Sequence, residues 1–479
     1  MSTRLAVIGA GPGGYAAAFY AADLGMQVTL IDEEKNPGGV CLYRGCIPSK
    51  ALLHVAKLLD EAAHAAAWGI EFGEPKIKLD ELRGFKDRVV EKLTSGTGQV
   101  AKLRKVNYLQ GRASFSSSTS LRVRLSGGGE QTVDVDHVVI ATGSQPTRIP
   151  SLSLDSPRVL DSTGALDLPA IPETMLVIGG GYIGLELGSV YAALGTRVSV
   201  VEMTPGLLPG ADRDLVRILA QRIEKAFEKV MLSTKVTSMS AEAAGSASAG
   251  VTVTFEGDGA PEAASYDYVL VSIGRRPYSQ IEGLDRTKVQ VNDRGFIQTD
   301  HQRRTDDPAV FAIGDVAGEP MLAHKASHEA RVAVEAIAGH KAVFEPLAIP
   351  AVVFTDPEIA WAGLTETQAE TDKRPVEVAR FPWGASGRAI TLDRTDGMTK
   401  ILVDPATERV LGVGIVGPGA GELIAEGVLA IEMGATASDV KLTIHPHPTL
   451  SETVMEAAET FFGTATHVFK PKRKTASAG

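Results

Sequence analysis

Two glycine-rich βαβ patterns and a length of 479 residues predict an α/β protein that contains two Rossmann-like dinucleotide-binding domains. The first pattern lies at the N-terminus, and the second begins near residue 175. A chain of this length is typical of about three domains. We therefore expect the part of the chain that follows both patterns to fold as a further domain.

The first pattern, LAVIGAGPGGYAAAFYAADLGMQVTLID, predicts a buried strand over residues 5–8, a glycine turn, an alanine-rich helix and a second strand. In the G-x-G-x-x-G spacing, Gly9 makes the turn, Gly11 lets a pyrophosphate approach the backbone, and Gly14 lets the helix pack on the strand. Asp32 ends the second strand, where a carboxylate can bind ribose hydroxyls. A purely structural glycine turn is the alternative.

The second pattern, MLVIGGGYIGLELGSVYAALGTRVSVVE, repeats the turn with Gly179, Gly181 and Gly184 and the terminal acid with Glu202. A carboxylate there accepts a hydrogen bond from a free 2′-OH and repels a 2′-phosphate, and no arginine pair follows it in residues 203–205. The second nucleotide should therefore be NAD rather than NADP. Two dinucleotide sites indicate two electron carriers, of which a flavin with a nicotinamide is the usual pair.

Three further apolar runs end in glycine turns, namely ATGSQP (141–146), SIGRRP (272–277) and FAIGDVAG (311–318). In the last of them Asp315 follows the strand directly. A carboxylate in that position can reach a sugar or ribityl hydroxyl, and the alternative is an aspartate that caps a helix.

The composition excludes several classes of partner. A formal net charge of −10 offers no basic surface for nucleic acid or an anionic membrane. Lys470, Lys472, Arg473 and Lys474 are most simply a solvated tail. The N-terminal apolar stretch has the fixed glycine spacing that a signal peptide does not need, and no run of about 18 apolar residues occurs. We expect a soluble, cytoplasmic protein.

Both cysteines of the chain lie in GGVCLYRGCIPSK, residues 38–50. Five residues of ideal helix rise about 7.5 Å, so a Cys41–Cys46 disulfide needs a bent turn, which Gly45 allows and after which Pro48 can start the next regular segment. Such a bridge should be easy to open. A zinc site is disfavoured because two cysteines supply half of the ligands, and two unrelated free thiols remain an alternative. Lys50 is either a solvated lysine or a cation that stabilises a reduced flavin.

A candidate base lies in HPHPTLSE, residues 445–452. Two prolines restrict the backbone around His447, and Glu452 can hold its ring and stabilise the imidazolium. The alternative is that Glu452 completes a capping box with Thr449. His445 is taken as secondary.

Together, GGVCLYRGCIPSK, both glycine patterns, GDVAGEPMLAHKA and HPHPTLSE resemble the dihydrolipoamide dehydrogenase branch of the flavoprotein disulfide reductases, from about residue 4 to about residue 465. The resemblance implies that Cys41 exchanges with the substrate, that Cys46 contacts the flavin, that His447 is the base and that Glu452 is its partner. The implied FAD contacts are Gly9, Gly11, Gly14, Asp32, Cys41, Lys50, Ala113, Thr142, Gly143, Asp315 and Ala323. The implied NAD contacts are Gly179, Gly181, Gly184, Glu186, Glu202, Val236 and Gly274.

The resemblance also implies a domain order. Residues 1–150 form the FAD-binding domain, to which 276–347 return, and residues 151–275 form the NAD-binding domain. Residues 348–479 form an α+β dimerisation domain, whose histidine serves the disulfide of the other subunit in a homodimer.

One segment departs from the family pattern. Leu42-Tyr43-Arg44-Gly45 stands where the family usually has Leu-Asn-Val-Gly. Arg44 places a cation in the dithiol loop, so one hypothesis is that it lowers a thiolate pKa; the alternative is a solvent-facing arginine with no such role.

The implied reaction is the oxidation of protein-bound dihydrolipoamide by NAD⁺ with ping-pong kinetics, in service to 2-oxoacid dehydrogenase or glycine cleavage complexes. No lipoyl domain precedes Gly9, so the lipoyl group is expected on another protein, an acyltransferase (E2) or the glycine cleavage lipoyl protein. The alternatives are a glutathione-type reductase or a mainly structural subunit of a complex.

Overall fold

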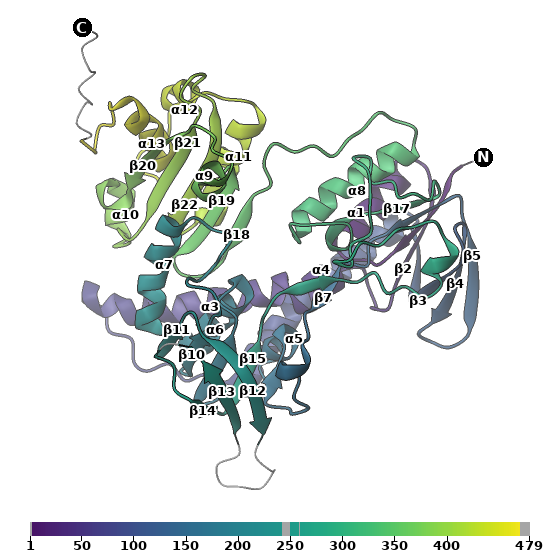
Figure 1. Ribbon diagram of the computed structural model, residues 1–479, viewed down its shortest axis with the longest axis horizontal. Coiled ribbons are helices and arrows are strands. Elements are labelled where there is room, and N and C mark those ends of the chain that lie inside the picture. The colour runs from purple at the N-terminus through teal and green to yellow at the C-terminus, as the bar shows by residue number, and fades with distance from the viewer. Residues whose placement is uncertain (1, 242–249, 258, 470–479) are drawn as a thin grey trace. The chain divides into compact units, whose positions relative to one another are not determined.

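The computed structural model describes residues 2–241, 250–257 and 259–469 (Figure 1). The basic cluster from Lys470 to Lys474 lies outside the described residues. The chain divides into two compact units. The first comprises Met1–Pro172, Ser238–Thr252 and Ser265–Glu345, and the second comprises Glu173–Thr237, Val253–Ala264 and Pro346–Gly479. Across the described ranges, no helix has both the length and the apolar character needed to cross a membrane.

A seven-stranded sheet with the order β17-β6-β1-β2-β3-β4-β5 forms the centre of the first unit. Its strands are β1 (Arg4–Ile8), β2 (Gln27–Asp32), β3 (Asn107–Ser117), β4 (Ser120–Leu125), β5 (Glu130–Asp134), β6 (His137–Ile140) and β17 (Val310–Ala312). The strands from β17 to β3 run parallel, whereas β3, β4 and β5 pair antiparallel. The turn after β1 therefore opens at the carboxyl edge of a parallel sheet, where nucleotides bind in such folds.

Both faces of this sheet are buried, which explains the continuous apolar run in β1. Leu5 and Val7 pack with the alanines of α1 (Pro12–Asp23) and α8 (Ala323–Ile337), which lie side by side in Figure 1. Ala6 and Ile8 point to the opposite face and pack with Phe115 of β3. The alternation places the glycine turn directly after a rigid strand.

The remaining elements of the first unit carry the dithiol and the connections. They are α2 (Gly39–Arg44), α3 (Cys46–His64), η1 (Ala65–Trp68), α4 (Leu79–Leu103), β7 (Ser144–Pro146), η2 (Pro150–Leu152), β8 (Val159–Leu160), α5 (Ser162–Leu166), β15 (Tyr268–Val271), β16 (Arg275–Pro277), η3 (Leu284–Arg286) and η4 (Gly314–Val316). Helix α4 packs against α2 and α3. Strands β7 and β16 pair antiparallel. Three further strands, β12 (Lys235–Ala241), β13 (Val251–Glu256) and β14 (Ala263–Tyr266), each have residues in both units.

The second unit begins with a parallel group in the order β11-β10-β9, formed by β9 (Thr174–Ile178), β10 (Arg197–Val201) and β11 (Lys229–Met231) with helices α6 (Tyr182–Ala193) and α7 (Arg213–Ala226). Its C-terminal part is an antiparallel sheet in the order β18-β19-β22-β21-β20. These strands are β18 (Ala351–Val353), β19 (Glu358–Gly363), β20 (Glu377–Pro382), β21 (Met398–Val403) and β22 (Val410–Gly417). The helices with this sheet are α9 (Glu366–Thr371), η5 (Trp383–Ala385), α10 (Gly387–Thr391), α11 (Ala420–Glu432), α12 (Ala437–Leu442) and α13 (Glu452–Phe462).

This arrangement confirms the predicted α/β class, with two βαβ patterns and an α+β C-terminal part. The core of that part surrounds Trp383, which is fully buried and donates from Nε1 to Thr399 Oγ1 at 3.0 Å. The predicted domain boundaries at residues 150, 275 and 348 stay a prediction.

Candidate active site

The turn between β1 and α1 is tightly packed at two of its glycines and open at the third. Gly9 has a φ of +96°, and a Cβ added to it would lie 2.4 Å from the carbonyl oxygen of Ala141. A Cβ on Gly14 would lie 1.8 Å from the carbonyl oxygen of Gly9. A Cβ on Gly11, the N-cap of α1, would meet nothing within 4 Å. Gly9 and Gly14 thus occupy the tight turn and the close packing position expected of them, whereas the contact of Gly11 with a pyrophosphate stays a prediction that open space at a helix N-terminus fits.

Asp32 stands at the end of β2, beside this turn. Its carboxylate accepts the N–H of Ala10 at 2.6 Å and the N–H of Glu34 at 3.0 Å. Burial raises the pKa of Asp32, and these two backbone donors act against that shift. The two backbone hydrogen bonds therefore hold the carboxylate of Asp32 in one orientation at the sheet edge where ribose hydroxyls are expected.

The second βαβ turn repeats the same arrangement. Gly179 has a φ of +110°, and a Cβ on Gly181 would again meet nothing within 4 Å. Glu202 accepts the N–H of Gly180 at 2.7 Å and the N–H of Thr204 at 2.8 Å. The two acids thus hold equivalent loops, and both turns fit the phosphates of a dinucleotide.

Asp315 lies in the 3₁₀ turn η4 and does not cap an α-helix, because α8 starts later at Ala323, with Leu322 as its N-cap. The capping alternative is therefore wrong. Its Oδ2 accepts the hydroxyl of Ser144 at 2.5 Å. No sequence pattern marks the buried Glu329, which accepts the N–H of Gly314 at 2.6 Å and so holds this turn in place.

The two cysteines lie at the junction of α2 and α3, with Cys46 exposed and Cys41 half-buried. Gly45 separates the two helices, and a Cβ added to it would lie 2.9 Å from the carbonyl oxygen of Val40, so this tight junction favours the glycine that was expected to allow a bent turn. The next helix begins at Cys46 itself, ahead of Pro48, which was expected to start it. Proline is tolerated throughout the first helical turn, so Pro48 fits at this later position.

The two sulfurs act on each other directly. A hydrogen bond with Cys46, then burial, raise the pKa of the Cys41 thiol, and the charge of Lys50 acts in the opposite direction. Tyr15 on α1 lies close enough that, after burial, the charges of Cys41 and Cys46 raise its pKa. Nothing in the sequence pattern marks Tyr15, whose position depends on how α1 packs.

His447 and Glu452 form a pair, with Nδ1 of the ring 2.9 Å from Oε1 of the carboxylate. The His447 side chain is 72% exposed, so its Nε2 faces outward from the pair. Glu452 also accepts the N–H of Thr449 at 2.8 Å, and Ser451, the N-cap of α13, has no side-chain capping bond. Both explanations of Glu452 therefore hold in part.

Electrostatics favour a charged Glu452. Burial alone would raise its pKa, but the Thr449 N–H and the hydrogen bond and charge of His447 reverse this, so the pKa of Glu452 is lowered. The carboxylate can therefore stabilise an imidazolium on His447. By contrast, the His445 side chain is 5% exposed and its Nε2 lies 2.6 Å from Glu426, which fits the structural role expected for it.

The other expected contact residues are distributed over both units. Ala113 is buried in β3, and Val236 is buried in β12. The hydroxyl of Thr142 donates to the carbonyl of Tyr278 at 2.6 Å, while Gly143 and Gly274 have φ of +71° and +105°. Glu186 is buried in α6, where its carboxylate accepts the N–H of Phe354 at 3.0 Å. The residues expected for FAD all lie in the first unit. The residues expected for NAD lie in the second unit, except Gly274, which lies in the first.

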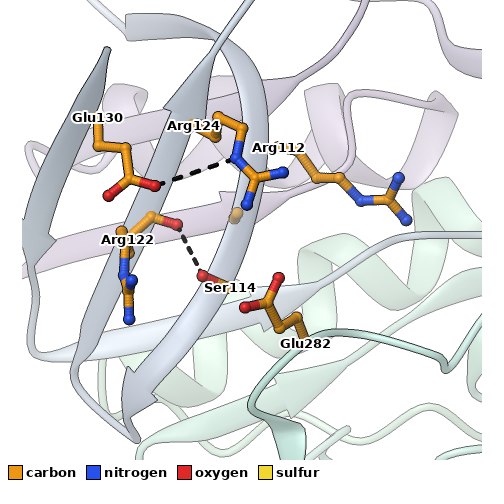
Figure 2. Close-up of a pocket in the computed structure, with 7 residues that line it drawn as sticks. Arg112, Ser114, Arg122, Arg124, Glu130 and Glu282 are labelled. Atoms are coloured by element: carbon orange, nitrogen blue, oxygen red, sulfur yellow. Dashed lines mark hydrogen bonds and ion pairs between the residues drawn. The ribbon is translucent and has the colours of Figure 1, made fainter.

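A pocket over β3 and β4 shares only Ala113 with the expected contact residues (Figure 2). It is lined by Arg112, Ala113, Ser114, Arg122, Arg124, Glu130 and Glu282. Ser114 donates to the carbonyl of Arg122 at 3.2 Å, and Arg124 lies 4.0 Å from Glu130. Its lining holds neither a thiol nor an imidazole, so the dithiol and the His447 pair remain the better candidates for the chemistry.

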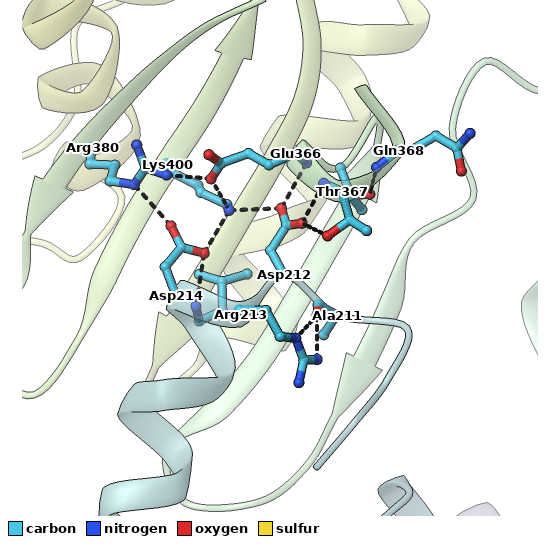
Figure 3. A network of polar contacts seen from close by, with 11 residues as sticks. Ala211, Asp212, Arg213, Asp214, Glu366, Thr367, Gln368, Arg380 and Lys400 are labelled. Carbon is cyan, nitrogen blue, oxygen red and sulfur yellow. Dashed lines mark hydrogen bonds and ion pairs between the residues drawn. The ribbon is translucent and has the colours of Figure 1, made fainter. Parts of the chain in front are cut away.

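Three carboxylates with the spacing of a metal site, those of Asp212, Asp214 and Glu366, surround the ammonium of Lys400 (Figure 3). Lys400 Nζ lies 2.7 Å from Asp212, 2.7 Å from Asp214 and 2.6 Å from Glu366, and its side chain is 1% exposed. Arg380 pairs with Asp214 and Glu366. The cluster is an ion network in which Lys400 is the buried cation that contacts all three carboxylates, and Arg380 is a second, more exposed cation that contacts two of them.

Known proteins are similar to this chain in sequence and in architecture. Residues 3–330 match the family model described as pyridine nucleotide-disulphide oxidoreductase, and residues 349–458 match its dimerisation domain. The chain is 49% identical to the dihydrolipoyl dehydrogenase of Haemophilus influenzae, over 99% of this chain and 98% of that one, and 45% identical to that of Geobacillus stearothermophilus, over 98% of each. It is similar to the crystal structure of LpdA from Mycobacterium tuberculosis, with a TM-score of 0.88 and 27% identity over 96% of this chain and 99% of that one. It is also similar to the flavoprotein disulfide reductase RclA from Escherichia coli, with a TM-score of 0.83 and 26% identity over 94% of this chain and 98% of that one.

Proposed function

This chain belongs to the pyridine nucleotide-disulphide oxidoreductase family, and from that premise we propose that it acts as a dihydrolipoyl dehydrogenase. Such an enzyme oxidises protein-bound dihydrolipoamide to lipoamide with NAD⁺. The observation that carries the proposal is the contact between Cys41 and Cys46, close to Lys50, in the same compact unit as the first nucleotide turn. A glutathione-type reductase is not favoured, because Glu202 stands where a 2′-phosphate would have to bind.

The first nucleotide turn fits FAD, held by Gly11 and the N-terminus of α1 with Asp32 at the ribose, and the second fits NAD, held by Gly181 with Glu202 at the ribose. When bound, FAD supplies the relay that carries an electron pair between the dithiol and NAD⁺. Ala113, Thr142, Gly143, Asp315 and Ala323 are assigned to FAD, and Gly179, Gly184, Glu186, Val236 and Gly274 to NAD.

The substrate exchanges with a disulfide between Cys41 and Cys46. His447 of the partner subunit takes the proton from a dihydrolipoyl thiol, and Glu452 stabilises the resulting imidazolium. The substrate thiolate attacks the sulfur of Cys41, the Cys41–Cys46 bond breaks, and Cys46 leaves as the thiolate. The second substrate thiol then attacks the mixed disulfide, which releases oxidised lipoamide and leaves Cys41 to take the proton. The substrate loses two electrons, and the enzyme disulfide gains them.

The match to the dimerisation domain supports a homodimer. The proposed partner is a lipoyl-bearing acyltransferase (E2) of a 2-oxoacid dehydrogenase complex, or the lipoyl protein of glycine cleavage. The proposed compartment is the cytoplasm, because a dithiol that must reopen in each cycle suits reducing surroundings.

Anaerobic addition of NADH or dihydrolipoamide to the purified protein tests this function, with NADPH as the control. We expect both reductants to produce a long-wavelength absorbance band from a thiolate against the flavin, and NADPH to produce little. Bleaching by NADPH alone, or a protein isolated without flavin, would contradict the proposal.

The Glu202→Gln variant should reduce the preference for NADH over NADPH by about tenfold, mainly through better use of NADPH. The carbonyl oxygen of glutamine can still accept one of the two N–H groups, that of Gly180 or that of Thr204, while the charge that repels a 2′-phosphate is gone. The ratio of kcat/KM for the two nucleotides measures this effect. Glu173→Gln, an exposed carboxylate in the same unit, is the control, and an unchanged ratio in Glu202→Gln would refute the assignment.

A further inference from the structure

The two side chains that depart from the family pattern between the cysteines reach back to the loop after Asp32. The hydroxyl of Tyr43 accepts the N–H of Asn36 and donates to the carbonyl of the same residue, both at 3.1 Å. Arg44 forms an ion pair with Glu34. The last turn of α2 is thus bound to residues 34–36, and the guanidinium of Arg44 is already matched with a carboxylate.

The loop that receives Arg44 belongs to the ribose end of the first nucleotide turn. The N–H of Glu34 donates to Asp32, and the carbonyl of Glu34 accepts the hydroxyl of Tyr108 at 2.8 Å. After burial and its two backbone donors, the next influences on the pKa of Asp32 are Glu34, which raises it, and Arg44, which lowers it. The pKa of Cys41 is raised overall, by its hydrogen bond with Cys46 and then by burial, and the cation that opposes this shift is Lys50. The charge of Arg44 therefore favours the ionised form of Asp32.

Removal of Arg44 would leave two neighbouring carboxylates, Asp32 and Glu34, near a turn that has to accept a diphosphate. Like charges at this distance oppose the binding of an anion. We propose that Arg44 is a positioning residue for FAD, which offsets Glu34 at the ribose loop, and that it does not tune the thiolates. The inference rests on the proposed FAD site and adds to it a contribution from the dithiol loop.

The test compares FAD retention with the thiolate signal in four proteins: native, Arg44→Met, Arg44→Met/Glu34→Gln and Arg104→Met. The last is a matched control, because Arg104 forms an ion pair with Asp23 in the same unit at 2.9 Å, with side chains 37% and 49% exposed, against 41% and 24% for Arg44 and Glu34. The dissociation constant of FAD is measured by ultrafiltration and the fluorescence of released flavin. The pH dependence of the thiolate-to-flavin absorbance band is recorded on the loaded proteins.

We expect Arg44→Met to raise the dissociation constant about fivefold, the double variant to return within about twofold of native, and Arg104→Met to leave it unchanged. The pH midpoint of the absorbance band should not move in any variant. An unchanged dissociation constant in Arg44→Met, a double variant no better than Arg44→Met, or a raised pH midpoint with normal FAD retention would each overturn the inference. A native protein that binds no FAD would instead refute the proposed function itself.

Discussion

A dimer that pairs one Cys41→Ser chain with one His447→Gln chain should keep about half of the native dihydrolipoamide activity, although each variant alone should lose about a thousandfold or more. In Cys41→Ser the attacked disulfide cannot form, since the chain has two cysteines in all. In His447→Gln the base is absent. The restored activity is the expected result when each site takes its dithiol from one chain and its base from the other.

The reason lies in how two-fold symmetry distributes the residues. In the mixed dimer, one site contains both substitutions, Cys41→Ser from one chain and His447→Gln from the other, and is inactive twice over. The other site combines the native dithiol of one chain with the native base of the other. The exposed ring of His447, held by Glu452 through Nδ1, is able to serve a neighbouring chain. If each histidine served its own chain, both sites of the mixed dimer would be inactive.

Two affinity tags on co-expressed chains allow mixed dimers to be purified, and the rate of NAD⁺ reduction by dihydrolipoamide is the measurement. Oxidation of NADH by a one-electron acceptor, which bypasses the dithiol, should stay near native in every variant and so controls for folding and flavin content. A mixed dimer no more active than its parents would rule out shared sites.

The parts of the site that the sequence predicted are those that local chemistry determines. Gly9 and Gly14 are required by contacts at the turn itself, Gly45 is required by the α2–α3 junction, and Glu452 lies within one loop of His447. Periodicity and glycine spacing report such short-range constraints well.

The parts that the sequence did not predict depend on contacts between distant segments. Tyr15 approaches the dithiol through the packing of α1, and Glu329 reaches Gly314 from α8. Lys400 is the clearest case, because the aspartate that it binds at position 214 is 186 residues away. A lysine and an aspartate so far apart form no sequence pattern that would predict their ion pair, however strong that pair is in the folded protein.

Replacement of Lys400 by methionine should therefore have a large effect on stability. Methionine fills a similar volume but leaves the carboxylates of Asp212, Asp214 and Glu366 without the ammonium that all three contact. Breaking a buried pair by removing one partner costs about 3–5 kcal/mol, and we expect the apparent Tm to fall by roughly 5–10 °C. Thermal unfolding followed by circular dichroism at pH 7 measures the change.

The pH dependence separates this electrostatic cost from a packing defect. In the native protein burial acts to raise the pKa values of Asp212 and Asp214, but Lys400 and the other donors outweigh it, so both pKa values are lowered. Groups with a lowered pKa contribute stability above their unfolded value, near pH 4, and lose it as the pH falls through the folded value. In Lys400→Met, burial without the ammonium should raise both pKa values, so these carboxyls take up protons above pH 4 and the protein recovers part of its lost stability.

The difference in Tm between native and variant should thus be largest near pH 7 and should shrink as the pH falls toward 4. Lys78→Met is the matched control, because Lys78 pairs with Glu81 at 2.9 Å with both side chains more than 70% exposed, and its loss should cost less than about 1 kcal/mol at any pH. A cavity or a misfit thioether would lower the Tm of Lys400→Met equally at every pH. A constant difference would therefore show that Lys400 stabilises the second unit by packing, whereas a difference that narrows toward pH 4 would show that it acts as the internal cation of the three carboxylates.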